Sequence, residues 1–165
     1  MSGFPLSAAP VAVVGSRFGS PFGVAAFASA VIQSGGHVLT GCAAGVDRVA
    51  ARAAAAAGAR VTRVPALSGW AARPVASRVV VAASQSPADL ATRTRCVVSG
   101  AVAVAIFPPA GGALGVGSAL ALRLALVRGV PVFVAGPLAP ARSGWRSATV
   151  AGVAGWVFVG QPSLF

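Results

Sequence analysis

Short apolar runs alternate along this chain with alanine-rich stretches of helical length, and this alternation restricts the fold more than any other feature. The runs that predict strands are 11–14, 37–40, 60–64, 101–107 and 132–134, and a further strand is expected over 150–159. The stretches that predict helices are 22–34, 45–57, 87–98 and 117–128. Strands that are apolar throughout are typical of a sheet with helices on both faces. The sequence therefore predicts an α/β fold whose sheet is mostly parallel and doubly wound.

The chain has 165 residues, a usual length for a single domain. We expect the core of this domain over 10–137, followed by a C-terminal extension over 138–165 that holds one possible extra strand. The stretch 137–144 is the candidate linker. The pattern is weaker between the third strand and the third helix. There Trp70, flanked by prolines, predicts a loop, and 78–83 is either a strand or a sheet edge.

Carboxylates are almost absent. Lys and Arg total 13, all of them Arg, against 2 acidic residues, so the formal net charge is +11. Because Asp47 and Asp89 are the two acids, chemistry that needs several carboxylates is excluded, such as an acidic metal cage or a pair of catalytic glutamates. Cys42 and Cys96 form no metal-ligand spacing with the single His37. We expect neither a metal nor a cofactor.

The arginines indicate an anionic partner. A guanidinium presents a planar fork of donors that suits phosphate, and the sequence pI is about 12.0. The same residues are also spread along the chain, as charges that only keep an apolar protein in solution would be. Both interpretations of the charge stay open at this point.

We expect a cytoplasmic protein without membrane contact. The N-terminus lacks the charged start of a signal peptide. The uncharged stretch 96–122 is interrupted by Pro108, Pro109, Gly111 and Gly112, which leaves pieces too short to span a bilayer. Abundant Ala and Val also predict apolar surface patches, which often mark interfaces, so we expect a homo-oligomer.

Four glycine-containing turns follow predicted strands. They are 15–17, 40–47, 108–118 and 135–137. In open α/β sheets ligands bind beyond the carboxyl ends of the strands, where glycine lets the backbone approach a phosphate and helix N-termini offer free N–H groups. The turns therefore predict either a phosphate-bearing ligand or only tight-turn geometry. The usual dinucleotide fingerprint is not met, because Ser16 and Arg17 follow Gly15 where a second glycine is required.

The order of four segments resembles the SLOG superfamily of Rossmann-like proteins. The segments are VAVVGSR, TGCAAGVDRVAARAA, RTRCVVSGAVAVAIFPPAGGALGVGS and ALALRLALVRGVPVFVAGP. Within that superfamily the DNA-processing proteins (DprA/Smf) are similar through a GSR turn, a glycine–aspartate turn, an arginine segment and a late glycine/serine turn. The YspA-like branch is equally similar. The resemblance spans 10–137 and implies a Rossmann-like three-layer sandwich.

The resemblance also implies binding residues at the matching positions. Those that would face a nucleotide or phosphate are Gly15, Ser16, Arg17, Gly41, Gly45, Asp47, Gly111, Gly112, Gly115, Gly117 and Ser118. Those that would bind a nucleic acid are Arg17, Arg93 and Arg95, to which the second helix adds Arg48.

Two departures from the resemblance limit what it implies. The DNA-processing proteins have Arg-Asn-Arg where Thr94 replaces the central Asn here. The phosphoribohydrolase branch requires P-G-G-x-G-T-x-x-E, whereas this chain has Ala-Gly-Gly-Ala-Leu-Gly and no glutamate. Hydrolysis of an N-glycosidic bond is therefore not expected.

The acids and their neighbours also have structural interpretations. Asp47 either holds a ribose hydroxyl or a base edge, or it caps its helix. Asp89 stands four residues before Arg93, which favours an ordinary helix ion pair and would leave Arg95 freer than Arg93.

Further residues have two interpretations each. Arg48 and Arg52 form either a phosphate-facing stripe or a solvated face. We expect His37 and Cys42 to pack rather than react. Most aromatic side chains are expected in the core, whereas Trp70 is placed to stack on a base.

Four functional hypotheses follow. The leading one is a non-catalytic binder of single-stranded nucleic acid that uses a basic, glycine-lined crevice, with Arg17, Arg93 and Arg95 pairing with phosphates. The alternative is a binder or sensor of a free nucleotide-derived ligand in the same crevice. A nucleotide-processing enzyme is a weaker hypothesis, because Asp47 would act without a second acid. A structural or assembly role is the fourth.

Overall fold

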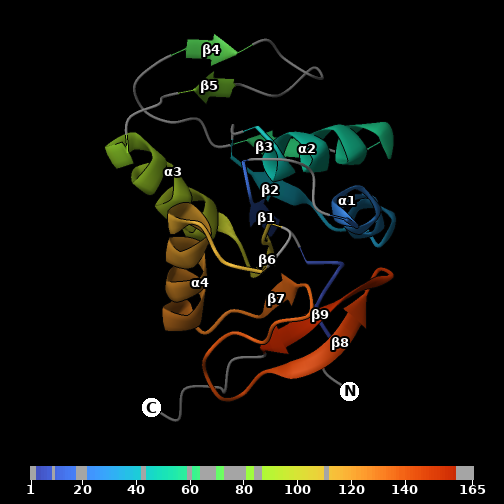
Figure 1. The fold of residues 1–165 in the computed structure, drawn as a ribbon. Helices are drawn as coiled ribbons and strands as arrows, with labels where there is room; N and C mark the ends of the chain where they lie inside the picture. Colours follow the sequence, from blue (N-terminus) through green and yellow to red (C-terminus); the bar gives the residue numbers. More distant parts are fainter. Residues whose placement is uncertain are drawn as a thin grey trace.

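The computed structural model describes residues 3–8, 10–17, 22–41, 44–58, 61–63, 70–72, 81–83, 87–109 and 112–158. The helices in these ranges are α1 (Val24–Gln33), α2 (Val46–Ala56), α3 (Pro87–Gly100) and α4 (Val116–Arg128) (Figure 1). The strands are β1 (Val11–Gly15), β2 (Val38–Thr40), β3 (Val61–Arg63), β4 (Trp70–Ala72), β5 (Val81–Ala83), β6 (Ala103–Phe107), β7 (Val132–Ala135), β8 (Arg146–Val150) and β9 (Val153–Phe158). None of the helices in the described part of the chain is both long and apolar enough to cross a membrane.

The main sheet is mixed and mostly parallel. Its order is β3-β2-β1-β6-β7-β9-β8. The pairs from β3 to β7 are parallel, whereas β9 pairs antiparallel with both β7 and β8. From β1, the strands β2 and β3 extend the sheet in one direction, and β6 and β7 extend it in the other. The strand order therefore reverses between β1 and β6. The predicted doubly wound sheet is therefore confirmed.

Helices cover both faces of this sheet (Figure 1). Along β1, Val11 and Val13 pack into a cluster with α1 and α2, whereas Ala12 packs into a second cluster with α3 and α4. Adjacent strands β6 and β7 alternate in the same way, with Phe107 and Phe133 in the first cluster. Side chains that point alternately to two apolar layers explain why these strands are apolar throughout. The three-layer sandwich implied by the resemblance is confirmed.

Four phenylalanines form the centre of the first cluster. The rings of Phe27 in α1 and Phe133 in β7 stack with centroids 5.6 Å apart and planes inclined by 5°. Phe107 meets Phe27 edge-on at 5.4 Å, and Phe4 lies 5.7 Å from the same ring. Gly155 in β9 makes room for this group, because a Cβ there would lie 2.7 Å from the Phe133 ring. The aromatic group thus joins α1, the parallel strands and the C-terminal hairpin in one core.

The C-terminal region differs from the prediction. The strand expected over 150–159 is present as β9, but it pairs with a strand that was not expected, β8. Ala151 and Gly152 both have positive φ, 51° and 78°, and turn the chain between the two strands. Two left-handed residues are the usual connection of a two-residue hairpin. The apolar run hides this turn, since Val150 and Val153 flank it. The candidate linker 137–144 connects β7 to β8 within one sheet.

The segment around Trp70 also differs from the prediction. Residues 70–72 form β4, which pairs antiparallel with β5 in a separate two-stranded sheet, where a loop had been expected. The prolines in this part of the sequence favour a loop, and a strand of three residues is too short to show a period of two. The strand expected over 78–83 is present as β5.

Arg128 in the last turn of α4 links α4 to α3. Its guanidinium donates through Nη1 to the carbonyl oxygens of Val98 and Ala101, the second at 2.9 Å. These carbonyls lie at the end of α3, where the Val98 carbonyl also accepts from the N–H of Ala101 at 3.2 Å and where the helix dipole favours a positive charge. Arg128 therefore caps a neighbouring helix.

We expect Arg128→Ala to lower the free energy of unfolding by about 1–2 kcal/mol, because two carbonyls lose a charged donor. Chemical denaturation followed by circular dichroism measures this change. The matched control is Arg123→Ala, which removes the same charge from an exposed position of α4. Equal stability of the two variants would contradict the capping role.

Candidate functional site

The predicted turns lie at one edge of the main sheet. Because β1, β2, β6 and β7 are parallel, their carboxyl ends at Gly15, Thr40, Phe107 and Ala135 share this edge, called here the carboxyl edge. The hydroxyl of Thr40 donates to the carbonyl of Val13 at 3.0 Å and fixes the end of β2 beside β1. The strand order reverses between β1 and β6, and ligands bind at such a reversal in open α/β sheets.

The turn after β1 contacts both neighbouring turns through backbone atoms. The N–H of Val46 donates to the carbonyl of Ser16 at 3.0 Å, and the N–H of Ser16 donates to the carbonyl of Phe107 at 3.2 Å. A Cβ at Gly15 would lie 2.3 Å from the Phe107 oxygen, and a Cβ at Gly45 would lie 2.3 Å from the Ser16 oxygen. No side chain fits at either position, so these glycines are required by packing whether or not a ligand binds.

The side chains of Asp47 and Arg93 both approach Gly41. A Cβ at Gly41 would lie 2.7 Å from Oδ2 of Asp47 and 2.9 Å from Nε of Arg93. Asp47 is 6% exposed, and Arg93 is half-buried. A guanidinium next to a carboxylate reduces the cost of burying both charges. The structure thus brings together an acid from α2 and a base from α3, which are far apart in the sequence.

Asp47 was expected either to hold a ribose hydroxyl or a base edge, or to cap its helix, and the structure bears on both interpretations. The N-cap residue of α2 is Gly45, which has no side chain to cap the helix. The Asp47 carboxylate lies beside the Arg93 guanidinium and the backbone of Gly41, at the carboxyl edge. The side chain of Asp89, the expected helix partner of Arg93, lies outside the described residues.

The other predicted arginines are solvent-exposed. Arg17 is held by its backbone against Gly45 and leaves its side chain exposed at the carboxyl edge. Arg48 is exposed in the first turn of α2. Arg95 is exposed on α3, and two residues rotate a helix by about 200°, so it points away from Arg93. The structure therefore does not bring Arg95 to the place where Arg93 meets Asp47.

The late glycine turn leads into the start of α4. Its N-cap residue is Gly115, and the first bond of the helix runs from the N–H of Ala119 to the Gly115 carbonyl at 2.9 Å. A Cβ at Gly115 or Gly117 would have nothing within 4 Å, so packing does not require these two glycines. Ser118 is buried. Gly111 lies outside the described residues.

Gly112 is the described member of this turn whose backbone conformation favours glycine. It has φ +83°, and a Cβ there would lie 2.6 Å from Cδ1 of Leu138. Leu138 belongs to the loop after β7, so this contact joins the loops that follow β6 and β7.

The remaining candidates lie elsewhere or outside the described residues. His37 precedes β2 and is half-buried at the opposite edge of the sheet, where its carbonyl accepts from the N–H of Val11 at 2.7 Å. Cys42 and the side chain of Trp70 are outside the described residues, and Cys96 is an exposed free thiol. Within the described ranges, no three His, Cys, Asp or Glu side chains gather as a metal site requires.

Sequence reasoning missed three exposed apolar side chains at the carboxyl edge. Phe22 is 89% exposed after β1, Val116 is 91% exposed after β6, and Leu138 is 58% exposed after β7. Apolar residues next to a strand are read as core by default. The signal that could have found them is position, because each one lies in or next to the connection that follows a parallel strand.

We expect Gly45→Ala to lower the free energy of unfolding by at least about 2 kcal/mol, because Gly45 has φ +71° and ψ −126°, a conformation that only glycine adopts readily. Thermal and urea denaturation measure the loss. Gly117→Ala is the control. It should be as stable as the parent or more stable, by up to about 1 kcal/mol, because alanine favours a helix. Two variants of similar stability would show that the turns do not need this backbone contact.

The chain matches no protein-family model, and no curated protein matches it significantly. Solved structures do match. One is DNA processing protein A from Helicobacter pylori, which is described with its single-stranded DNA binding mode. It matches with a TM-score of 0.59 and 19% sequence identity, over 83% of this chain and 70% of that chain. Another is the X-ray structure of TM1055, a Northeast Structural Genomics Consortium target. It matches with a TM-score of 0.56 and 21% sequence identity, over 75% of this chain and 72% of that chain. At the level of the fold, these likenesses support the resemblance to Rossmann-like DNA-processing proteins that the four sequence segments indicate.

Proposed function

We propose that this protein binds single-stranded nucleic acid along the carboxyl edge of its main sheet and catalyses no reaction there. The observation that carries the proposal is the meeting of Arg93 with Asp47 and Gly41 at the edge where Arg17 is also exposed. Arg17 and Arg93 pair with phosphates of the nucleic acid. The glycine-containing turns let the nucleic-acid strand approach the main chain of the protein.

Charge supports this proposal. Among the described side chains, the carboxyl edge carries Arg17, Arg48 and Arg93 with the carboxylate of Asp47, within a chain of formal net charge +11. Arginine binds phosphate through paired donors, and its charge attracts a polyanion before contact.

The exposed apolar side chains support a nucleic acid over a simple anion. Proteins that bind single strands combine a positive surface with aromatic side chains on which bases stack. Phe22 is an exposed aromatic residue in the connection after β1, the same connection that carries Arg17. The Helicobacter pylori protein of similar fold, described as binding single-stranded DNA, adds support by analogy.

A free nucleotide-derived ligand is the second candidate function. The open start of α4 favours it, because Gly115 and Gly117 have nothing within 4 Å of a Cβ position and the first-turn N–H groups of a helix attract phosphate. Competition separates the two candidates. A mononucleotide that displaces an oligonucleotide at equal concentration would favour the free ligand.

We expect Arg17→Ala and Arg93→Ala each to weaken binding of a labelled single-stranded oligonucleotide about 10-fold, because each removes a charged donor to phosphate. Fluorescence anisotropy across a salt series measures this. Each variant should also reduce the slope of log affinity against log salt by about 0.7, the value for one phosphate contact on a single strand.

Arg123→Ala is the matched control, since it removes an exposed charge from α4. Arg93→Lys tests whether charge alone suffices, and thermal melts confirm that each variant is folded. The proposed function is wrong if Arg17→Ala and Arg93→Ala bind as tightly as the control.

Phe22→Ala should weaken single-strand binding about 5-fold or more without changing stability, because the side chain is 89% exposed and its stacking partner is the ligand. Val127→Ala is the control, an exposed apolar residue near the far end of α4. Oligonucleotide affinities from anisotropy give the comparison. Identical affinities for the two variants would remove Phe22 from the binding surface.

A further inference from the structure

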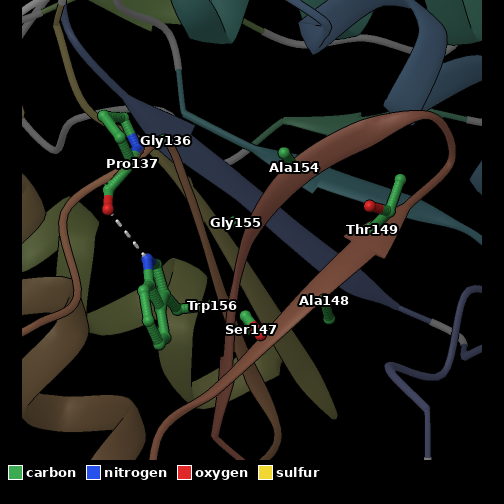
Figure 2. Close-up of a pocket in the computed structure, with 8 residues that line it drawn as sticks. All are labelled: Gly136, Pro137, Ser147, Ala148, Thr149, Ala154, Gly155 and Trp156. Atoms are coloured by element: carbon green, nitrogen blue, oxygen red, sulfur yellow. Dashed lines mark hydrogen bonds between the residues drawn. The ribbon is translucent and has the colours of Figure 1, made fainter.

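We propose that a hollow on the C-terminal hairpin, walled by Trp156, is a nucleobase-binding subsite. This inference rests on the proposed function, because the base is taken to belong to a strand held at the carboxyl edge. The hollow has a volume of about 470 Å³. Its lining residues are Gly136, Pro137, Ser147, Ala148, Thr149, Ala154, Gly155 and Trp156 (Figure 2).

The hollow exists because the hairpin extends the sheet beyond its helices. Trp145 and Phe158, with ring centroids 5.5 Å apart, pack against the cluster beneath α3 and α4. Farther along the same face the hairpin is open. Thr149 pairs with Ala154 across the strands, and both side chains are exposed.

Trp156 provides a flat wall with a fixed orientation. Its indole N–H donates to the carbonyl of Pro137 at 3.3 Å, which holds the ring against the loop that follows β7 (Figure 2). Ser147 lies directly opposite Trp156 in the hairpin. A half-buried indole whose polar atom is already bonded offers its remaining surface to an apolar, planar ligand.

The polar groups of the hollow suit a base more than an aliphatic ligand. Ser147 and Thr149 contribute hydroxyls that both donate and accept, as the edges of all four bases require. Arg142 is exposed in the segment that precedes β8 and attracts the phosphates that accompany a base. The volume lies within the range of small-ligand sites.

The hollow adjoins the carboxyl edge. Gly136 directly follows β7 there, and its N–H donates to the carbonyl of Ala154 at 3.0 Å. The residue after Pro137 is Leu138, whose side chain contacts Gly112 in the late glycine turn. A nucleic-acid strand bound at the late glycine turn therefore has a direct path to Trp156. The same subsite would accept the base of a free nucleotide, and the experiment separates these two sources.

The test compares Trp156→Leu, Trp156→Phe and Ala154→Gln with Trp145→Phe as the matched control. Trp145 packs against Phe158 and does not line the hollow, whereas Ala154→Gln fills the hollow and leaves Trp156 in place. The probes are a labelled single-stranded oligonucleotide of about 15 nucleotides, its abasic counterpart and the four nucleoside monophosphates. Anisotropy gives affinity, and tryptophan fluorescence reports stacking.

We expect Trp156→Leu and Ala154→Gln to weaken oligonucleotide binding about 10-fold, while Trp156→Phe keeps most of the affinity. The abasic probe should bind the parent and Trp156→Leu equally weakly. With Trp70→Phe added to both variants, binding should quench tryptophan fluorescence in Trp145→Phe but not in Trp156→Phe. Normal affinity of both Trp156→Leu and Ala154→Gln, with Arg17→Ala still weakened, would overturn the subsite and leave the proposed function standing.

The opposite result is also distinguishable. If the oligonucleotide does not bind but, with Trp70→Phe in both variants, a nucleoside monophosphate quenches Trp145→Phe and not Trp156→Phe, the subsite is confirmed and the proposed function is overturned. If neither probe binds or quenches, both are overturned.

Discussion

The backbone contact between Gly45 and the turn after β1 determines how the carboxyl edge is arranged. Since no Cβ fits between Gly45 and Ser16, the two turns touch through main-chain atoms alone, and α2 starts directly against the end of β1. This start places Asp47 beside Gly41, and Asp47 in turn lies beside Arg93. The turn that begins α2 therefore positions the carboxylate that lies nearest to Arg93 at Gly41.

Arginines in this chain find partners other than carboxylates, because 13 basic residues share 2 acids. Arg128 donates to the final carbonyls of α3, which serve as a negative helix end. Arg93 lies beside one of the acids. Arg17, Arg48 and Arg95 are exposed. Charges of one sign that repel each other across a surface are stabilised when a polyanion binds, so the shortage of acids itself favours an anionic partner.

The layered fold could be predicted from sequence because buried parallel strands are apolar runs that glycines and prolines delimit. The hairpin could not, since the apolar run continues through Ala151 and Gly152 and hides the turn. At the carboxyl edge, the turn motifs placed Gly15, Gly45 and Asp47 correctly relative to the strands. The approach of Arg93 and Asp47 to Gly41 was not predictable, because helix rotation against a sheet is set by packing. The divergence of Arg95 from Arg93 does follow from the predicted helix, in which two residues differ by about 200°. The exposure of Phe22 depends in the same way on how α1 is oriented.

The central position of β1 has a consequence for how the protein folds. One neighbour, β2, follows it closely, but the other, β6, is synthesised only after most of the chain. Closing so long a loop is slow, and until it closes β1 presents an unpaired edge to other chains. The turns that meet at the carboxyl edge come from both halves of the sheet, so this edge is completed late. A ligand that binds there recognises only the finished sheet and shifts the folding equilibrium toward it.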